Sequence, residues 1–493
     1  MAPMTPNDLP PEIVFKIITL SLGRSDESNP RVHRWKLKFL RACCLVCRGW
    51  LDVCQAFLFQ NVYIRRTRTF ILFCRSLSSP RNVGKYVRKL LVALPTWEDT
   101  SPYPMPRGVE KCLRLLEGLE ELEIKPPFDG FFSEKALNQI HGLVKLRKVT
   151  IRRVCGLQVA NIKAYADRSV DFGADEKLDI FRQLVLPKTV EHLELVQPSI
   201  EFMDHLPTIL SEVYSAKPTD STTDAGASSS EAQPVKPPEA TRGLKSFSLQ
   251  VSSVYNRLTN PNIYDKLPQL LSANMTSFKL VLDTRLEDQT IIDLLASTPF
   301  LEELKLGRIG VSEFLFSQLA PLKSLRSMSL IAHGPPLEVD IGIDWLDFCN
   351  VMTSFVDKSP LLESFEFDTA LSIHTTFVSL MLELLYNSTL ESTRTYSRLK
   401  HLTIKHTDPP PVSSIERMCE RAPFLETLSI KVPVRNLGRL RLALAKLTHL
   451  QRLELNNFLM VRKLFSPRID VEPFFRFTDR QNVKRDIQQN FTF

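Results

Sequence analysis

Residues 301–306 read LEELKL, an apolar-x-x-apolar-x-apolar pattern that recurs through most of this 493-residue chain. Twelve stretches fit the pattern: 87–92 (VRKLLV), 119–124 (LEELEI), 146–151 (LRKVTI), 190–195 (VEHLEL), 244–249 (LKSFSL), 275–280 (MTSFKL), 301–306 (LEELKL), 325–330 (LRSMSL), 362–367 (LESFEF), 399–404 (LKHLTI), 425–430 (LETLSI) and 450–455 (LQRLEL). From residue 244 onward, successive copies begin 24 to 37 residues apart. The closing apolar-x-apolar of each copy predicts a short strand with alternate side chains on opposite faces.

The spacing of the copies indicates how the predicted strands are arranged in the fold. A period near 25 residues with this pattern is the signature of leucine-rich repeats, whose units complete one core by stacking on their neighbours. Segments 288–296 and 311–319 carry apolar residues at three- and four-residue spacing and predict helices between the strands. We therefore expect an α/β fold, a leucine-rich-repeat-like solenoid of short parallel strands alternating with helices, over residues 58–480. The usual Asn or Cys after the pattern is almost absent, so the solenoid should be irregular.

One stretch interrupts the repeats. Residues 216–243 contain no Leu, Ile, Phe, Tyr or Trp and are rich in Pro, Ser, Thr and Ala, which predicts a disordered insertion. It could be a phosphorylated regulatory loop or a passive insertion. Residues 481–493 are expected to form a C-terminal tail.

Composition excludes several classes of protein. The chain has only 16 glycines, and their spacing provides no GxGxxG dinucleotide motif, no GxxxxGK phosphate loop and no GxSxG nucleophile elbow. The nine cysteines are irregularly spaced, unlike a secreted disulfide framework. The N-terminus does not resemble a signal peptide, and the longest uncharged run, 369–382, is too short to span a bilayer. We expect a cytoplasmic or nuclear protein without membrane segments.

The first 60 residues differ from the repeats. Residues 9–13 read LPPEI, in which the prolines suit a first helical turn, and Leu9, Ile13 and Ile17 share one face of the predicted helix. A second helical pattern covers residues 35–50 and ends in VCRGW, and a polar loop is expected at 21–34. Residues 1–100 carry 16 Lys and Arg against 7 Asp and Glu, a net charge of +9 that favours an acidic partner.

This N-terminal segment resembles the F-box, which combines an opening LPxEI helix with a closing (V/C)C(R/K)xW. The next part of the chain is similar to the fungal F-box family, with an edge strand at 58–64, a helix at 67–77 and then the repeats. The resemblance implies an F-box at residues 1–57 that docks on the Skp-type adaptor and cullin core of an SCF-type ubiquitin ligase, whose adaptor is acidic. It also implies that the repeats bind an unknown substrate protein, that the chain has no catalytic residues, and that it uses no cofactor or metal.

The resemblance also assigns residues. The positions matching the motif form the expected adaptor-binding set: Leu9, Pro10, Ile13, Ile17, Leu40, Val46, Cys47 and Trp50. The third and fifth positions of the repeat pattern point away from the core, so they form the expected substrate-binding face: Glu121, Glu123, His192, Glu194, Glu303, Lys305, Glu366, His401, Arg452 and Glu454. The acidic N-terminal members of that set favour a basic patch on the substrate.

Other interpretations remain open. The chain could be a leucine-rich-repeat interaction scaffold without a ubiquitin ligase role, or an enzyme with an unfamiliar site. Cys43, Cys44 and Cys47 have no second ligand pair for zinc, so we interpret them as core residues of a helix. The basic run 65–68 lacks interleaved aromatic residues, and no nucleic-acid partner is expected.

Overall fold

The chain forms two compact units, Met1–Leu244 and Lys245–Phe493. The structure is a computed structural model, and it describes residues 9–22, 30–79, 83–94, 105–125, 132–152, 184–198, 200–214, 243–251, 274–282, 287–307, 313–332, 345–369, 382, 399–405, 409–422, 424–432 and 437–455. The expected insertion at 216–243, apart from its last residue, and the expected tail at 481–493 lie outside this part of the chain.

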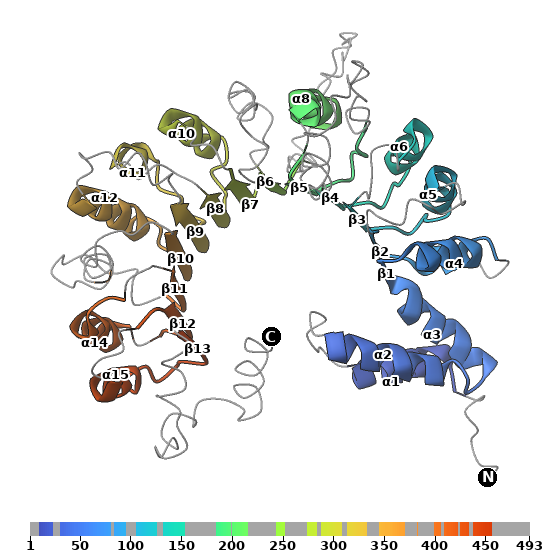
Figure 1. Cartoon of the computed structure of the whole chain (residues 1–493), viewed down its shortest axis with the longest axis horizontal. Coiled ribbons are helices and arrows are strands. Elements are labelled where there is room, and N and C mark those ends of the chain that lie inside the picture. The colour runs from blue at the N-terminus through green and yellow to red at the C-terminus, as the bar shows by residue number, and fades with distance from the viewer. Residues whose placement is uncertain are drawn as a thin grey trace, which may run out of the picture. The chain divides into compact units, whose positions relative to one another are not determined.

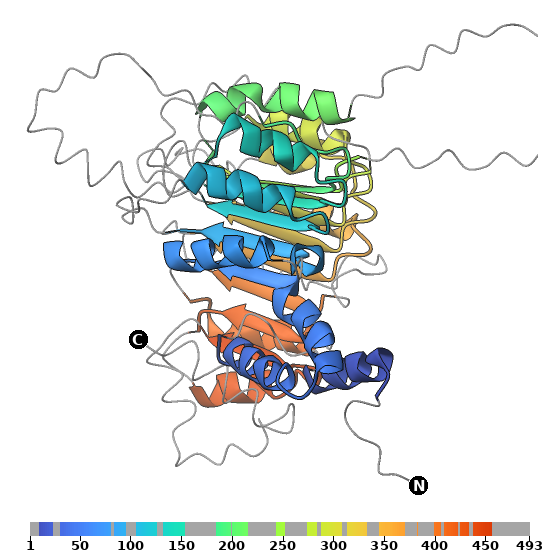
Figure 2. The ribbon, with the colours of Figure 1, turned by 90° about the vertical axis from the view of Figure 1, so that its right-hand side faces the viewer.

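The first unit begins with three helices and continues into strand–helix repeats (Figure 1). Its helices are α1 (Pro11–Leu22), α2 (Pro30–Cys43), α3 (Arg48–Gln60), α4 (Thr67–Leu77), α5 (Met105–Arg114), α6 (Glu134–His141) and α8 (Ile200–Tyr214), with a 3₁₀ turn at Val83–Tyr86. Its strands are β1 (Asn61–Ile64), β2 (Lys89–Ala93), β3 (Glu121–Lys125), β4 (Lys148–Arg152) and β5 (His192–Val196). Each strand pairs in parallel with the next one along the chain. Figure 2 shows α4, α5, α6 and α8 stacked in chain order alongside these strands.

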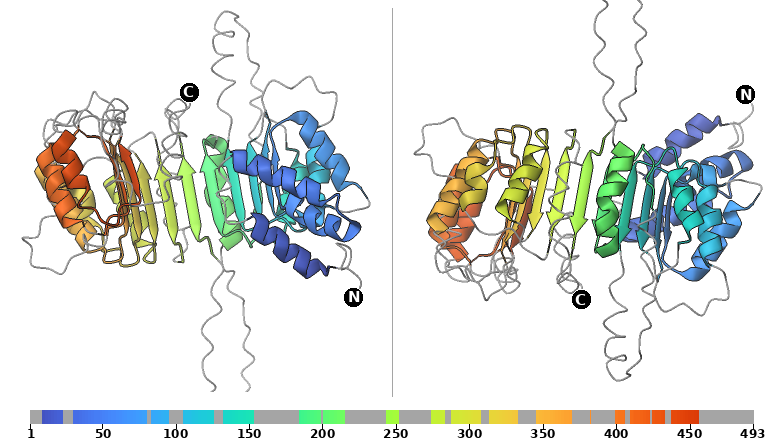
Figure 3. Two further views of the ribbon diagram at one scale, coloured as in Figure 1. Left: turned by 90° about the horizontal axis from the view of Figure 1, so that it is seen from below. Right: turned by 90° about the horizontal axis from the view of Figure 1, so that it is seen from above.

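The second unit repeats the same arrangement. Its strands are β6 (Ser246–Gln250), β7 (Ser277–Val281), β8 (Glu303–Gly307), β9 (Ser327–Ala332), β10 (Ser364–Thr369), β11 (His401–Lys405), β12 (Thr427–Ile430) and β13 (Arg452–Leu455), all parallel and paired in chain order. Its helices are α10 (Asp288–Ala296), α11 (Glu313–Gln318), α12 (Trp345–Asp357), α14 (Val412–Arg421) and α15 (Leu437–Leu444). Figure 3 shows these helices on one side of the strands.

Each of the twelve sequence copies contains one strand, as the pattern predicts. In β3, Leu122 and Ile124 are buried while Glu121 and Glu123 face the opposite side of the sheet and are half-buried. The register aligns Leu122 with the equivalent apolar residue of each neighbouring strand, so the cores of successive repeats are continuous. The strands of each unit pair in chain order as a parallel sheet of leucine-rich-repeat type, and this confirms the α/β fold class.

Helices between the strands bury one face against the sheet. In α10, Ile291, Leu294 and Leu295 are buried, at the three- and four-residue spacing that predicted a helix at 288–296. The helix expected at 311–319 is present as α11, and the one expected at 67–77 is α4. Full burial of each such aliphatic side chain contributes about 1.5–3 kcal/mol.

Three expectations for the N-terminal segment need correction. The single helix expected at 35–50 is two helices, because the amides of Leu45 and Val46 bond carbonyls only three residues back and tighten the last turn of α2. The edge strand begins at Asn61 rather than at residue 58, because α3 continues through Gln60. The loop expected at 21–34 is helical at both ends, since α1 extends to Leu22 and α2 begins at Pro30; residues 23–29 lie outside the described residues.

Candidate interaction surfaces

The three N-terminal helices share a small core. It consists of Val14 and Ile18 from α1, Leu40 and Cys43 from α2, and Cys54 from α3, all less than a tenth exposed. Because Val14 and Ile18 are four residues apart, they fix which face of α1 points inward. The remaining faces of α1 are therefore left for solvent or for a partner.

The outward face of α1 carries a stripe of large apolar side chains. Ile13 is 45% exposed, Ile17 is 38% exposed and Leu20 is 73% exposed, at positions i, i+4 and i+7 of the helix. We call these three residues the α1 stripe. A regular exposed apolar row on an amphipathic helix is typical of a surface that docks on another protein.

The structure divides the expected adaptor-binding set into two groups. Leu40 is buried, and Leu9 and Trp50 are half-buried against the same core, so these three side chains hold the helices together. Cys47 is half-buried at the start of α3. The others lie at the surface: Pro10, Ile13, Ile17 and Val46.

Sequence reasoning missed four exposed apolar residues of this region as surface positions: Phe15, Leu20, Trp35 and Leu45. Leu20 continues the i, i+4, i+7 spacing of Ile13 and Ile17, so the spacing could have identified it. Leu45 is 88% exposed in the turn between α2 and α3. The sequence pattern does not predict its exposure, because residues 35–50 read as one continuous helix.

Cys43, Cys44 and Cys54 pack in the interior of this segment, whereas Cys47, also predicted as a core residue, is half-buried at the start of α3. Burial raises the pKa of the Cys54 thiol to about 12, with further increases from the neighbouring Cys44 and Cys43. Burial likewise raises the pKa of Cys43 and of Cys44. These thiols stay protonated and unreactive at neutral pH. Across the described residues, no group of three or more His, Cys, Asp or Glu side chains could hold a metal ion.

The second candidate surface is the strand face, defined as the strand side chains on the side of each sheet away from the helices. In the first unit, Glu121 and His192 lie in one row across the sheet, and Glu123 and Glu194 lie in the next row. In the second unit the remaining predicted residues also occupy two adjacent rows: Glu303, His401 and Arg452 in one, Lys305, Glu366 and Glu454 in the other. The side chain of Glu454 lies outside the described residues.

Ion pairs partly neutralise the three predicted glutamates of the first unit. Lys89 Nζ lies 2.7 Å from Glu121 Oε1, and Arg152 lies between two carboxylates, at 2.8 Å from Glu123 and 3.3 Å from Glu194. The Nε atom of Arg152 is close to Glu123 without hydrogen-bond geometry, so this contact is mainly electrostatic. The expectation of a basic patch on the substrate rests on the acids alone, and these neighbouring cations weaken it.

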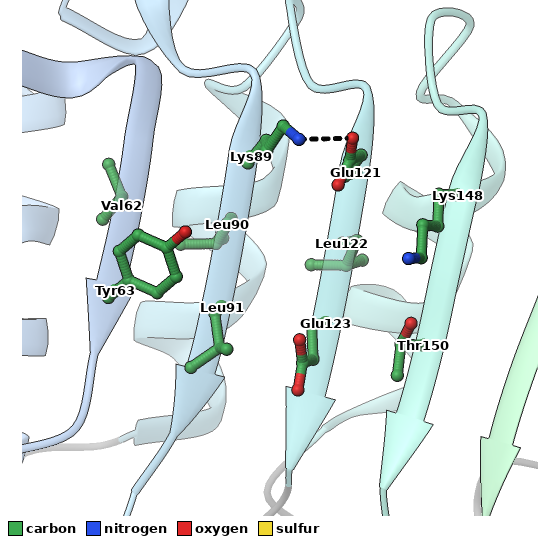
Figure 4. Close-up of a pocket in the computed structure, with 10 residues that line it drawn as sticks. All are labelled: Val62, Tyr63, Lys89, Leu90, Leu91, Glu121, Leu122, Glu123, Lys148 and Thr150. Carbon is green, nitrogen blue, oxygen red and sulfur yellow. Dashed lines mark ion pairs between the residues drawn. The ribbon is translucent and has the colours of Figure 1, made fainter. Parts of the chain in front are cut away.

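A shallow pocket of about 70 Å³ opens on this face (Figure 4). Tyr63 and Leu91 form its apolar side, while Lys89, Glu121 and Lys148 provide charges. The pocket is small and open to solvent, so it suits a single small side chain rather than a cofactor. The repeat pattern did not identify Tyr63, because β1 precedes the first copy.

In the second unit, Glu303 and Glu366 are centres of polar networks. Ser277 Oγ donates to Glu303 at 2.8 Å, and Lys279 Nζ lies 2.8 Å from the same carboxylate. Burial opposes ionisation of Glu303, but the hydrogen bonds from Lys279 and Ser277 outweigh it and lower its pKa.

Glu366 has an equivalent environment. Its carboxylate accepts from Ser329 Oγ and from Lys405 Nζ, each at 2.8 Å, and Lys305 Nζ lies 4.0 Å away. Burial would raise its pKa, yet these bonds lower it. Both carboxylates are therefore ionised at neutral pH and preorganised by their neighbours. None of the partners Ser277, Lys279, Ser329 and Lys405 was singled out from the sequence.

Comparison with known proteins finds similar chains among solved structures but not among family models or curated proteins. No family model matches the chain, and no curated protein matches it. Among solved structures, the chain is similar to a chain of the Rad7–Elc1 complex of yeast, with 14% identity and a TM-score of 0.37 over 83% of this chain and 94% of that one.

Two leucine-rich-repeat proteins give similar values. The Legionella pneumophila protein LegL7 has 12% identity and a TM-score of 0.34, over 78% of this chain and 99% of that one. A Leptospira interrogans leucine-rich-repeat protein has 14% identity and a TM-score of 0.29, over 74% and 84%. At such scores the likeness carries no functional information, and function must be argued from the chain's own residues. None of the described helices is long and apolar enough to cross a membrane.

Proposed function

We propose that this chain is a substrate-recognition subunit of an SCF-type ubiquitin ligase, related to fungal F-box proteins. Residues 1–57 would be the F-box that docks on the Skp-type adaptor and thereby on the cullin core. Residues 58–480 would bind the substrate protein through the strand face, and the chain would have no catalytic residue, cofactor or metal of its own. It would act in the cytoplasm or nucleus.

The α1 stripe is the observation that carries this proposal. Ile13, the last residue of the LPPEI motif, is exposed together with Ile17 and Leu20, whereas their neighbours Val14 and Ile18 are buried in the core. Full burial of an isoleucine side chain contributes about 1.5–3 kcal/mol, and Ile13 and Ile17 are already more than half buried, so covering the rest of each contributes roughly half of that or less. A partner groove that covers the whole α1 stripe therefore gains a favourable apolar contact.

The strand face supports the second half of the proposal. Its side chains come from stacked repeats, and its ion pairs hold them in fixed positions, as on a preorganised binding surface. The small open pocket beside Tyr63 fits a single side chain of a protein partner.

Co-purification of the full-length protein with the Skp-type adaptor tests the proposal. The double variant Ile13→Asp, Ile17→Asp should lose the adaptor, because two charged groups would replace the covered apolar ones, and affinity should fall roughly a hundredfold or more. The melting temperature should remain near that of the wild type, since both side chains are outside the core.

Val144→Asp is the matched control, because Val144 is an exposed apolar residue (70%) in a repeat turn far along the sequence from α1. It should keep the adaptor. A wild-type chain that never retains the adaptor, or a double variant that retains it fully, would favour an interaction scaffold without a ligase role. Deleting residues 1–57 and identifying the retained proteins by mass spectrometry would then show which partners depend on the repeats alone.

A further inference from the structure

Three large apolar side chains are exposed at equivalent positions in the second unit. Phe300 is 59% exposed, Leu361 is 43% exposed and Phe424 is 50% exposed, and each lies immediately before the first leucine of a repeat pattern. In the sequence each one follows a proline, in the segments TPFL, SPLL and APFL. We call Phe300, Leu361 and Phe424 the apolar ladder.

The local structure forces these side chains outward. On both sides of Phe300 the chain is buried: Thr298 is fully buried and donates to the carbonyls of Leu294 and Leu295 at the end of α10, and Leu301 is in the core. The chain is held in the same way on both sides of Leu361. Ser359 is buried and donates to the Phe355 carbonyl at 3.2 Å, and Leu362 is in the core.

The third position follows the same scheme. Ala422 and Leu425, which flank the turn containing Phe424, are both buried. At each of the three positions, the exposed residue lies between two buried ones and therefore cannot enter the core without breaking the repeat. Within the described residues, the one aromatic contact of these three side chains is that between Phe424 and His449, whose rings lie 5.9 Å apart.

The ladder has a regular spacing. Phe300 precedes β8, Leu361 precedes β10 and Phe424 precedes β12, and the order of the sheet places one strand between each pair. Two strand spacings amount to about 10 Å. Residues seven apart on an α-helix are separated by a rise of about 10.5 Å, which is close to that distance. Alternate residues of an extended strand are only about 7 Å apart, which fits less well.

Unpaired cations lie among these positions. Lys323 and Arg326, in the turn before β9, and Lys358, just before Ser359, are exposed and have no ion pair within the described residues. Two acids flank Arg326 on the neighbouring repeats: the exposed Glu302, and Glu363, which forms an ion pair with Lys400 at 3.2 Å. Apart from that neutral pair, Lys323, Arg326, Lys358 and Glu302 sum to +2, so the surface between Phe300 and Leu361 is positively charged and favours acidic groups.

We propose that the apolar ladder is a docking surface for an amphipathic helix of a partner protein, which presents large apolar residues at i, i+7 and i+14 and acidic residues between them. The helix would lie along the edge where the strands begin and cross several repeats. This surface is separate from the α1 stripe and from the strand face, so the inference does not depend on the proposed function.

Fluorescence anisotropy with the full-length protein tests the inference. The probe is a labelled alanine-rich helical peptide of about 20 residues with leucine at i, i+7 and i+14 and glutamate one turn after each leucine. The triple variant Phe300→Ser, Leu361→Ser, Phe424→Ser should weaken its binding at least about tenfold. Leu442→Ser is the matched control, because Leu442 is 71% exposed on α15, away from the ladder, and it should bind as the wild type does.

Charge reversal provides a test that leaves the apolar residues in place. Lys323→Glu with Lys358→Glu should weaken binding of the glutamate peptide and strengthen binding of a peptide in which lysine replaces glutamate. Equal binding by the wild type and the triple variant would overturn the inference, and so would failure of the wild type to prefer the glutamate probe. A concentration-dependent dimer that the triple variant abolishes would also overturn it, by identifying a second copy of the chain as the occupant.

Discussion

Glu366 shows how single residues prepare the strand face. It accepts hydrogen bonds from a serine one strand away and from a lysine on the strand at its other side. Neither partner is near it in the sequence, at 37 and 39 residues, so parallel register alone brings the three together. The strand face thereby gains a negative group that its neighbours hold in a fixed position.

The lowered pKa of Glu366 predicts a pH-dependent contribution to stability. A carboxyl whose folded pKa lies below its unfolded value stabilises the fold above the unfolded pKa, and this contribution is lost as the pH falls through the folded pKa. Glu366→Gln should therefore lower the free energy of unfolding at pH 7 by less than about 1 kcal/mol, because the network is partly screened by solvent.

Urea unfolding of both proteins over a pH series would measure this difference. The gap between wild type and variant should shrink once the pH drops below about 4, the ordinary range for glutamate, and vanish in stronger acid. A gap that grows with acidity would contradict the assigned hydrogen bonds. Glu117→Gln, at an exposed glutamate that has no hydrogen bond or ion pair within the described residues, is a control that should not reproduce the effect.

At the scale of elements, turn residues determine where each helix stops and each strand starts. Ser133 begins α6 by accepting a hydrogen bond from the Ala136 amide at 3.2 Å. Thr298 and Ser359 end α10 and α12 by bonding carbonyls of the last turn. These small polar side chains form hydrogen bonds with the backbone of the turns, as the Asn or Cys that is missing from the repeat pattern would have done.

Replacing Ser133 by alanine should remove the cap of α6. The expected cost is about 1 kcal/mol of unfolding free energy, since one amide at the helix start would lose its partner. Urea unfolding followed by circular dichroism would measure it. Ser317→Ala, an exposed serine on α11, should cost less, and equal costs for both substitutions would contradict a specific capping role.

At the scale of the whole molecule, each unit has a core of its own. Within a stack of repeats, each repeat contacts its neighbours and little else, so stability is close to a sum of local terms. Damage to one repeat is therefore expected to spread over adjacent strands and not over the entire chain.

Phe365→Ala tests this locality. Phe365 is fully buried in β10, and its truncation should cost about 3–5 kcal/mol through lost burial and a cavity. Hydrogen exchange of the full-length protein should accelerate in β9, β10 and β11, and it should stay unchanged in β2 and β3 of the other unit. Uniform acceleration along the chain would show that the two units unfold as one.

The sequence by itself determined the strands and many of the helices. The repeat pattern placed a strand in each of its twelve copies, because alternating apolar residues can be buried on only one face of a sheet. It also indicated which strand residues point away from the core, and the register places the ten predicted ones in two rows of each unit. The assignment of those rows to substrate binding remains a prediction, as does the boundary of the N-terminal module at residue 57.

Only the tertiary structure decided which of these residues are available and how they are charged. It buried Leu40 and left Ile13 and Ile17 exposed, because packing of α1, α2 and α3 selects one face of each helix. It also paired Glu121 and Glu123 with Lys89 and Arg152, whose positions depend on register between strands far apart in the sequence. Periodicity is a local property of the chain, whereas exposure and charge balance depend on what lies across from each residue after folding.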